Sequence, residues 1–166
     1  ETPNVESLKE CGKMQNVSRN LVETVKIIQQ NGMQVMGGFI VGFDSDTETV
    51  FDTQIGFIQQ IGVVTAMVGL LNALPQTRLW HRLKAEGRLT GEPSGNIDAS
   101  MNFTPKMDKA KLIAGYKRIL SNIYSPKLYY QRIETFINNY EPAVKRKRST
   151  GDGKAWRGSI WRSGIL

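Results

Sequence analysis

The sequence has one cysteine, Cys11, and one histidine, His81, among its 166 residues. A single cysteine excludes an internal disulfide, and it excludes a metal or cluster site built from several cysteines of this chain. A single histidine excludes multi-histidine metal sites and argues against a serine–histidine–aspartate triad. Scarce cysteine is typical of a reducing compartment, so we expect a cytoplasmic protein. No apolar run is long enough to cross a bilayer, and we expect no transmembrane segment.

The charge is unbalanced, with 22 lysines and arginines against 15 acidic residues and a net charge of +7. Much of the excess lies in the tail at 143–166, in Lys145, Arg146, Lys147, Arg148, Lys154, Arg157 and Arg162. Such a tail could bind nucleic acid. We favour a solvated, flexible tail instead, and we do not expect nucleic acid as a partner.

The chain begins at Glu1 without a methionine, and we interpret it as a piece of a longer protein. Apolar spacing predicts a short helix over Val5–Lys13. Ser18 is predicted to cap a second helix, which ends near Gly32.

The central stretch, 32–47, is an apolar run between glycines that ends in an acidic turn. It predicts a buried strand over Met33–Val41. Gly38 and Gly42 have no side chains, so a flat ligand could approach the backbone closely at these positions. The spacing of Ser45 and Glu48 matches a capping box and predicts the start of a helix that runs to Gly62.

A second buried strand is predicted over Val63–Leu74, followed by a helix that Thr77 caps and that ends near Gly87. Helices alternating with strands favour right-handed crossovers and a parallel sheet. The loops at 42–46 and 73–77 would then lie at one edge of the sheet, where a ligand is expected. Two strands leave the sheet incomplete, with an exposed edge.

Residues 88–105 are rich in glycine and proline and predict a loop. Asp108 is predicted to cap a helix, and Ser125 with Pro126 at the first helical position starts another, which ends at Pro142. The second half therefore indicates an all-helical extension.

Several segments together resemble the second half of cobalamin-binding radical S-adenosylmethionine enzymes. They are Glu1-Thr2-Pro3, Lys13-Met14-Gln15-Asn16, the stretch 37–47, and Ala73-Leu74-Pro75-Gln76-Thr77. Tyr116, Tyr124-Ser125-Pro126 and Tyr129-Tyr130 are similar to the helical extension of the branch that includes hopanoid methylases, called Fe-S oxidoreductases or methyltransferases.

This resemblance implies an α/β fold: part of a (β/α) barrel at 1–88, a helical extension at 89–142, and the basic tail at 143–166. It also implies S-adenosylmethionine, a 4Fe-4S cluster and cobalamin in the intact protein. The cluster loop of such enzymes, Cys-x3-Cys-x2-Cys, is absent from this sequence. We therefore expect the isolated chain to be inactive and to bind none of these cofactors, and we expect Cys11 to be a small buried apolar residue.

The resemblance also implies cofactor-binding residues. The segment Gly38-x-Ile40-x-Gly42 matches the motif that faces the adenine ring, and Glu1 matches a polar residue near the sugar or amino acid part. Asn72 would line the same opening. Asp46 stands where many members have glutamate, as a ligand or as a helix cap. His81 is expected on a helix surface.

The implied partners are a small-molecule or lipid-like substrate, the missing N-terminal half of the same chain, and a second copy bound through the exposed sheet edge. Two other functions stay open. A nucleotide-binding α/β module would need a phosphate cradle, whereas the turn after the first strand carries Asp44 and Asp46 and no lysine or arginine. A nucleic-acid-binding domain would use the tail with Trp156 and Trp161.

Overall fold

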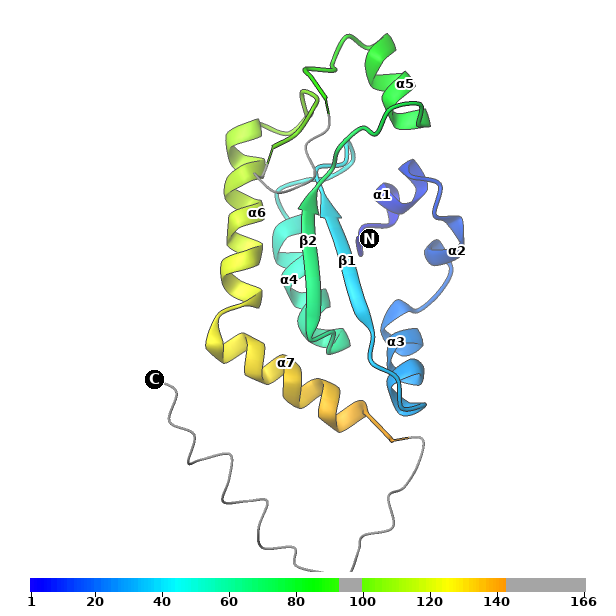
Figure 1. The fold of residues 1–166 in the computed structure, drawn as a ribbon, viewed down its shortest axis with the longest axis vertical. Helices are drawn as coiled ribbons and strands as arrows, with labels where there is room; N and C mark the ends of the chain where they lie inside the picture. Colours follow the sequence, from blue (N-terminus) through cyan, green and yellow to red (C-terminus); the bar gives the residue numbers. More distant parts are fainter. Residues whose placement is uncertain (93–99, 143–166) are drawn as a thin grey trace, which may run out of the picture.

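The computed structural model describes residues 1–92 and 100–142. The basic tail at 143–166, with Trp156 and Trp161, lies outside the described residues, and so does the prediction that it is flexible. Figure 1 shows the helices and strands in order: α1 (Val5–Glu10), α2 (Met14–Val17), α3 (Leu21–Gln30), β1 (Met36–Val41), α4 (Val50–Ile61), β2 (Thr65–Leu70), α5 (Arg78–Ala85), α6 (Lys109–Ile123) and α7 (Pro126–Asn139).

The two strands pair in parallel, as the alternation of helices and strands predicts. Their register runs from Met36 opposite Thr65 to Val41 opposite Leu70. Both strands are shorter than predicted, because the predicted ranges were extended over mostly apolar residues at 33–35, 63–64 and 71–74 that lie outside the paired segment. The described residues form a mixed α/β structure with a two-stranded parallel sheet, and they do not show a barrel.

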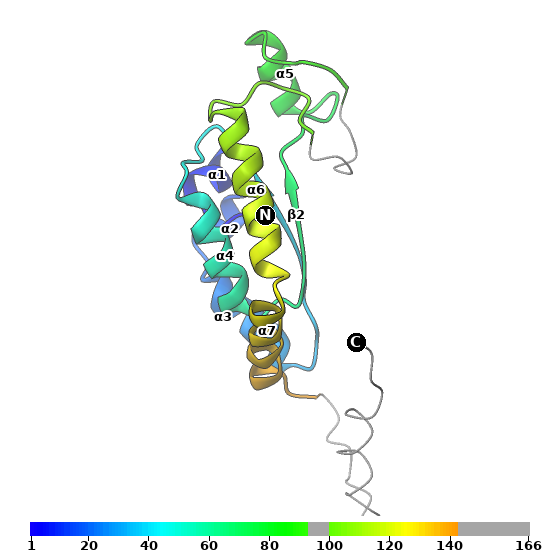
Figure 2. The same cartoon turned by 90° about the vertical axis from the view of Figure 1, so that its left-hand side faces the viewer.

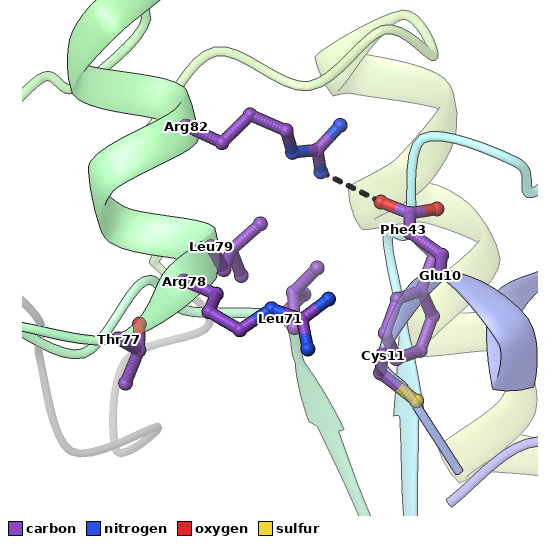
Figure 3. Close-up of a pocket in the computed structure, with 8 residues that line it drawn as sticks. All are labelled: Glu10, Cys11, Phe43, Leu71, Thr77, Arg78, Leu79 and Arg82. Atoms are coloured by element: carbon purple, nitrogen blue, oxygen red, sulfur yellow. Dashed lines mark hydrogen bonds and ion pairs between the residues drawn. The ribbon is translucent and has the colours of Figure 1, made fainter. Parts of the chain in front are cut away.

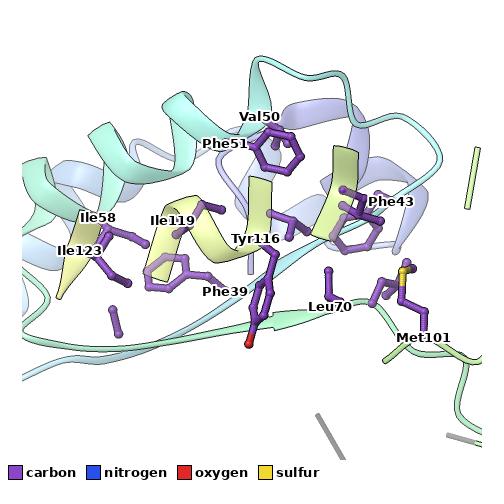
Figure 4. Packing of buried hydrophobic residues seen from close by; sticks show 14 of the residues in the cluster. Phe39, Phe43, Val50, Phe51, Ile58, Leu70, Met101, Tyr116, Ile119 and Ile123 are labelled. Atoms are coloured by element: carbon purple, nitrogen blue, oxygen red, sulfur yellow. The ribbon is translucent and has the colours of Figure 1, made fainter. Parts of the chain in front are cut away.

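One face of the sheet is buried. Phe39, Val41, Ala66 and Leu70 point to this face and join a single apolar cluster with α4 and α6. Figure 2 shows α4 and α6 on the same side of the strands, and Figure 4 shows the side chains between them. Burying such a cluster is the main favourable contribution to folding.

The opposite face is apolar, and no other part of residues 1–92 and 100–142 covers it. Met36 and Met67 are 66% and 60% exposed, and Ile40 is half-buried. A side chain at Gly38 would meet no atom within 4 Å. Strand alternation places these residues on one side, opposite the buried set. The sequence predicted an incomplete sheet with an exposed edge. The structure shows that one face of the sheet is uncovered as well.

Most predicted helix starts are confirmed. The side chains of Thr77, Asp108 and Ser125 each accept a hydrogen bond from a main-chain N–H in the first turn of α5, α6 and α7. Gly62 ends α4 in the left-handed conformation (φ 63°), which favours glycine.

Two predicted helix starts are wrong. Asn20, rather than Ser18, caps α3, because residues up to Val17 form the separate short helix α2. The capping box at 45–48 does not form, and α4 begins at Val50 without a side-chain cap. The reason is that the Ser45 hydroxyl donates to Glu10 and the Glu48 carboxylate accepts from Lys111.

The second half packs onto the first. Gly115 of α6 lies against the ring of Phe51 of α4, so that the two helices approach closely. Arg132 of α7 is fully buried and donates to the carbonyl oxygens of Ile123 and Val64. Burial lowers the pKa of this guanidinium.

The segment 88–105 lacks helices among its described residues, as predicted, but it is anchored to the core. Leu89 and Phe103 form an antiparallel bridge, and Met101 and Phe103 are buried. The chain thus returns from α5 to α6 across the ends of the strands.

Candidate functional site

An opening of about 500 Å³ lies at the carboxyl ends of the strands. It confirms the predicted position of the loops after β1 and β2 at one edge of the sheet. Figure 3 shows the side chains that line it, which come from α1, the strand ends and α5: Glu10, Cys11, Phe43, Leu71, Thr77, Arg78, Leu79 and Arg82.

The strands hold the apolar wall of this opening. The N–H of Leu71 donates to the carbonyl oxygen of Val41 at 2.9 Å, so the parallel pairing extends one residue beyond β2. Because side chains alternate along a strand, Leu71 continues the side of Met67 and Gly69. The open sheet face therefore leads to the opening.

A network of charges lies behind the opening. Both oxygens of the Asp44 carboxylate bind the guanidinium of Arg88, at 2.6 and 2.8 Å, and one of them also binds Arg82 at 2.9 Å. The Asp44 side chain is 7% exposed. The hydrogen bond from Arg88 lowers the pKa of Asp44 against the opposing effect of burial.

The same network links α5 to α1. Arg82 donates to Glu10 at 2.8 Å, and the other oxygen of Glu10 accepts from the N–H and the hydroxyl of Ser45. The turn after β1 is thus neutralised by arginines that are distant in the sequence. The prediction that this turn repels phosphate considered only the residues of the turn itself and therefore left these arginines out.

Asp46 is a loop-closing residue. Its Oδ2 accepts from the N–H groups of Gly42 and Phe43 at 2.9 and 3.1 Å, and its Oδ1 accepts from Ser7 and Asn4. The carboxylate is therefore occupied by this chain. Its predicted role as a cap of α4 is wrong.

The structure brings two predicted site residues together. The N–H of Ile40 donates to the carbonyl oxygen of Glu1 at 2.7 Å, so the start of the chain lies beside β1. The Glu1 carboxylate binds Lys13 at 3.1 Å. Gly38 stands on the open face of β1 near Ile40.

Gly42 and Asn72 have structural contacts. Gly42 has φ 107°, which favours glycine, and a side chain there would approach Leu112 and Met101 at 3.3 Å. Asn72 donates to the carbonyl oxygen of Ser100 and accepts from the N–H of Asn102. Both residues therefore hold loops at the strand ends, and their predicted contact with a cofactor stays a prediction.

Cys11 is exposed at the edge of the opening, so the prediction of a buried apolar cysteine is wrong. Partial burial, with the charge of Glu1, raises the pKa of its thiol. His81 is exposed on α5, edge-on to Trp80. Within residues 1–92 and 100–142, no three histidine, cysteine or acidic residues are grouped so as to hold a metal ion.

The arginines of α5 are the residues that sequence reasoning missed. Arg78 and Arg82 are four residues apart, and this spacing puts them on one side of a helix. The predicted helix cap at Thr77, together with this spacing, could have indicated that both arginines lie on the side of α5 that faces the strand ends. Their partner Glu10 comes from a helix that is distant in the sequence.

The family described as a domain of unknown function, DUF4070, matches residues 77–166. The chain belongs to this family. It shares 36% identity with an uncharacterized methyltransferase of Synechocystis and 31% with a hopanoid C-2 methylase of Rhodopseudomonas palustris, each over 99% of this chain. It shares 24% with a bacteriochlorophyllide d methyltransferase of Chlorobaculum tepidum, over 81% of this chain.

These relatives confirm the resemblance to the hopanoid-methylase branch. The chain spans about a third of their length: 32% of each of the first two and 29% of the third. No solved structure matches the chain. None of the described helices is long and apolar enough to cross a membrane.

Proposed function

We propose that this chain belongs to a methyltransferase that works with S-adenosylmethionine, a 4Fe-4S cluster and cobalamin, and that methylates a small apolar or lipid-like substrate. The names of the relatives support methyl transfer. The observation that carries the proposal is the uncovered backbone at Gly38 on the open face of β1, and this face leads to an opening at the strand ends. Ligands of parallel sheets bind at this end.

The face around Gly38 suits a flat, apolar group. A side chain at Gly38 would meet nothing, so an adenine ring can lie against this backbone, with Ile40 beside it. In the proposal, Gly38 and Ile40 contact the adenosyl group, while Phe43 and Leu71 contact the apolar part of a substrate. These residues bind and orient, and they exclude water from the reacting groups.

The cluster does not fit the described residues. They contain one cysteine, which is exposed and has a raised pKa, whereas three thiolates hold such a cluster in the enzymes that this chain resembles. We therefore assign the cluster and cobalamin to other parts of the longer protein and derive no step from them. On this proposal, the isolated chain has no methyl-transfer activity.

The open sheet face tests the proposal. In the full-length protein, we expect Gly38→Val to raise the dissociation constant of S-adenosylmethionine at least about tenfold, since the branched side chain occupies the space of the ring. Gly56→Val is the matched control, because a side chain at Gly56 of α4 also meets no atom within 4 Å. Equal affinity of both variants and wild type would contradict the proposal.

A further inference from the structure

The Arg78 side chain has no partner in the described part of the chain, although it lines the opening. No hydrogen bond or ion pair of Arg78 is formed within residues 1–92 and 100–142. Arg82, four residues later on α5, binds both Glu10 and Asp44. The two arginines of the opening therefore differ in kind: one is neutralised by carboxylates and the other is not.

Arg78 reaches across the opening. Its Nη1 lies 4.0 Å from the place that a side chain on Gly12 would take, and Gly12 follows α1 on the other side. Figure 3 shows the guanidinium extending from α5 toward the strand ends, with Leu71, Phe43 and Leu79 around it. An unpaired guanidinium beside an apolar wall is suited to a planar, singly charged oxyanion.

The net charge of the side chains that line the opening also favours a ligand with one negative group. Among the residues that line it, Glu10 is balanced by Arg82, and Arg78 remains as one uncompensated positive charge. Phe43, Leu71 and Leu79 form the apolar part of the wall. We propose that Arg78 is a specificity-determining residue that binds the single carboxylate of a ligand whose apolar body lies against Phe43, Leu71 and Leu79.

The inference rests on the proposed function only in treating the opening as a ligand site. The carboxylate can come from two sources, a methyl acceptor or the amino acid part of S-adenosylmethionine. Both present the same chemistry to Arg78. The probes below separate them, and none of the measurements needs cluster, cobalamin or reductant.

The test compares octanoate with octanamide, which has the same chain length without the charge, by isothermal titration calorimetry of the full-length protein. We expect octanoate to bind at least about fivefold more tightly, because a charge-assisted hydrogen bond is stronger than a neutral one. In Arg78→Gln the ratio should fall to about one through weaker octanoate binding, with octanamide unchanged. Arg78→Lys, which keeps the charge, should retain part of the preference.

The control is Arg19→Gln, which removes one positive charge from an exposed arginine between α2 and α3, away from the opening. It should leave the ratio as in wild type. Arg78 is exposed, so the glutamine variant should fold normally. Equal binding of octanoate and octanamide to wild type, or an unchanged ratio in Arg78→Gln, would overturn the inference.

A second titration, also on the full-length protein, identifies the source of the carboxylate. If S-adenosylhomocysteine competes with octanoate and also loses affinity in Arg78→Gln, the carboxylate is that of the cofactor. If it does neither, the carboxylate belongs to the acceptor. Failure of the whole proposed function would instead appear as absent iron and cobalamin in the full-length protein, whatever the result with octanoate.

Discussion

The guanidinium of Arg88 binds the two carboxylate oxygens of Asp44 with two hydrogen bonds, at 2.6 and 2.8 Å. The side chains are 16% and 7% exposed, so the pair is largely removed from water. It joins the segment after α5 to the turn after β1. The position of α5 over the opening therefore depends on a pairing between residues 44 positions apart.

Replacing Arg88 should destabilise the fold. We expect Arg88→Met to lower the free energy of unfolding by about 2–4 kcal/mol, because it leaves a buried carboxylate with only part of its pairing. Urea unfolding of the 166-residue chain measures the change. The control is Lys111→Met: Lys111 binds Glu48 at the same 2.6 Å, but both side chains are over half exposed. Its cost should be much smaller, because exposed ion pairs contribute little to stability, and equal costs would contradict the account.

The Asp44 pairing also predicts a pH dependence. Its folded pKa lies below its ordinary value because of the hydrogen bond from Arg88, so its stabilising effect is present above the ordinary value and is lost as the pH falls through the folded pKa. Wild type should be more stable than Asp44→Asn at pH 7, and the difference should shrink below about pH 4. Unfolding curves between pH 2 and 7 measure it. A difference that stays constant over this range would show that Asp44 is not the group responsible.

The contact between α4 and α6 predicts opposite effects for two glycines. A side chain at Gly115 would overlap the Phe51 ring, whereas one at Gly56 would meet nothing within 4 Å. Gly115→Ala should therefore lose about 1–3 kcal/mol of stability. Gly56→Ala should gain about 0.5–1 kcal/mol, since alanine favours the helix. Thermal unfolding of both variants checks the sign, and stabilisation by Gly115→Ala would refute the close packing of these helices.

The open sheet face predicts self-association of the isolated chain. Met36 and Met67 are largely exposed on it, and apolar faces of this kind tend to be covered. Sedimentation velocity should show a concentration-dependent dimer that Met36→Glu with Met67→Glu weakens. Met14→Glu is the control, because Met14 is 58% exposed on α2 instead. A monomer at every concentration would count against the prediction.

Local signals in the sequence predicted much of the fold. The caps at Thr77, Asp108 and Ser125 formed because each side chain serves the helix that follows it directly. The parallel pairing followed from the alternation of helices and strands. The capping box at 45–48 failed because the Ser45 hydroxyl instead binds Glu10 of α1 and the Glu48 carboxylate binds Lys111 of α6, two partners that only the folded chain brings close.

The candidate site was predictable in position but not in chemistry. Strand order placed the opening after β1 and β2, and Gly38 was recognised as bare backbone. The charge network was missed because Glu10, Asp44 and Arg82 come from three distant segments that only the folded chain brings together. Cys11 was misjudged for the same reason, since its exposure depends on where α1 ends relative to the opening.

The most direct test of the proposed function is the iron and cobalamin content of the full-length protein, purified without oxygen. We predict about four irons and bound cobalamin for each chain, with the visible absorption of an iron–sulfur cluster. Cleavage of S-adenosylmethionine on addition of a reductant should accompany them. A full-length protein that holds neither iron nor cobalamin after reconstitution would contradict the account and would leave the similarity as one of sequence and fold alone.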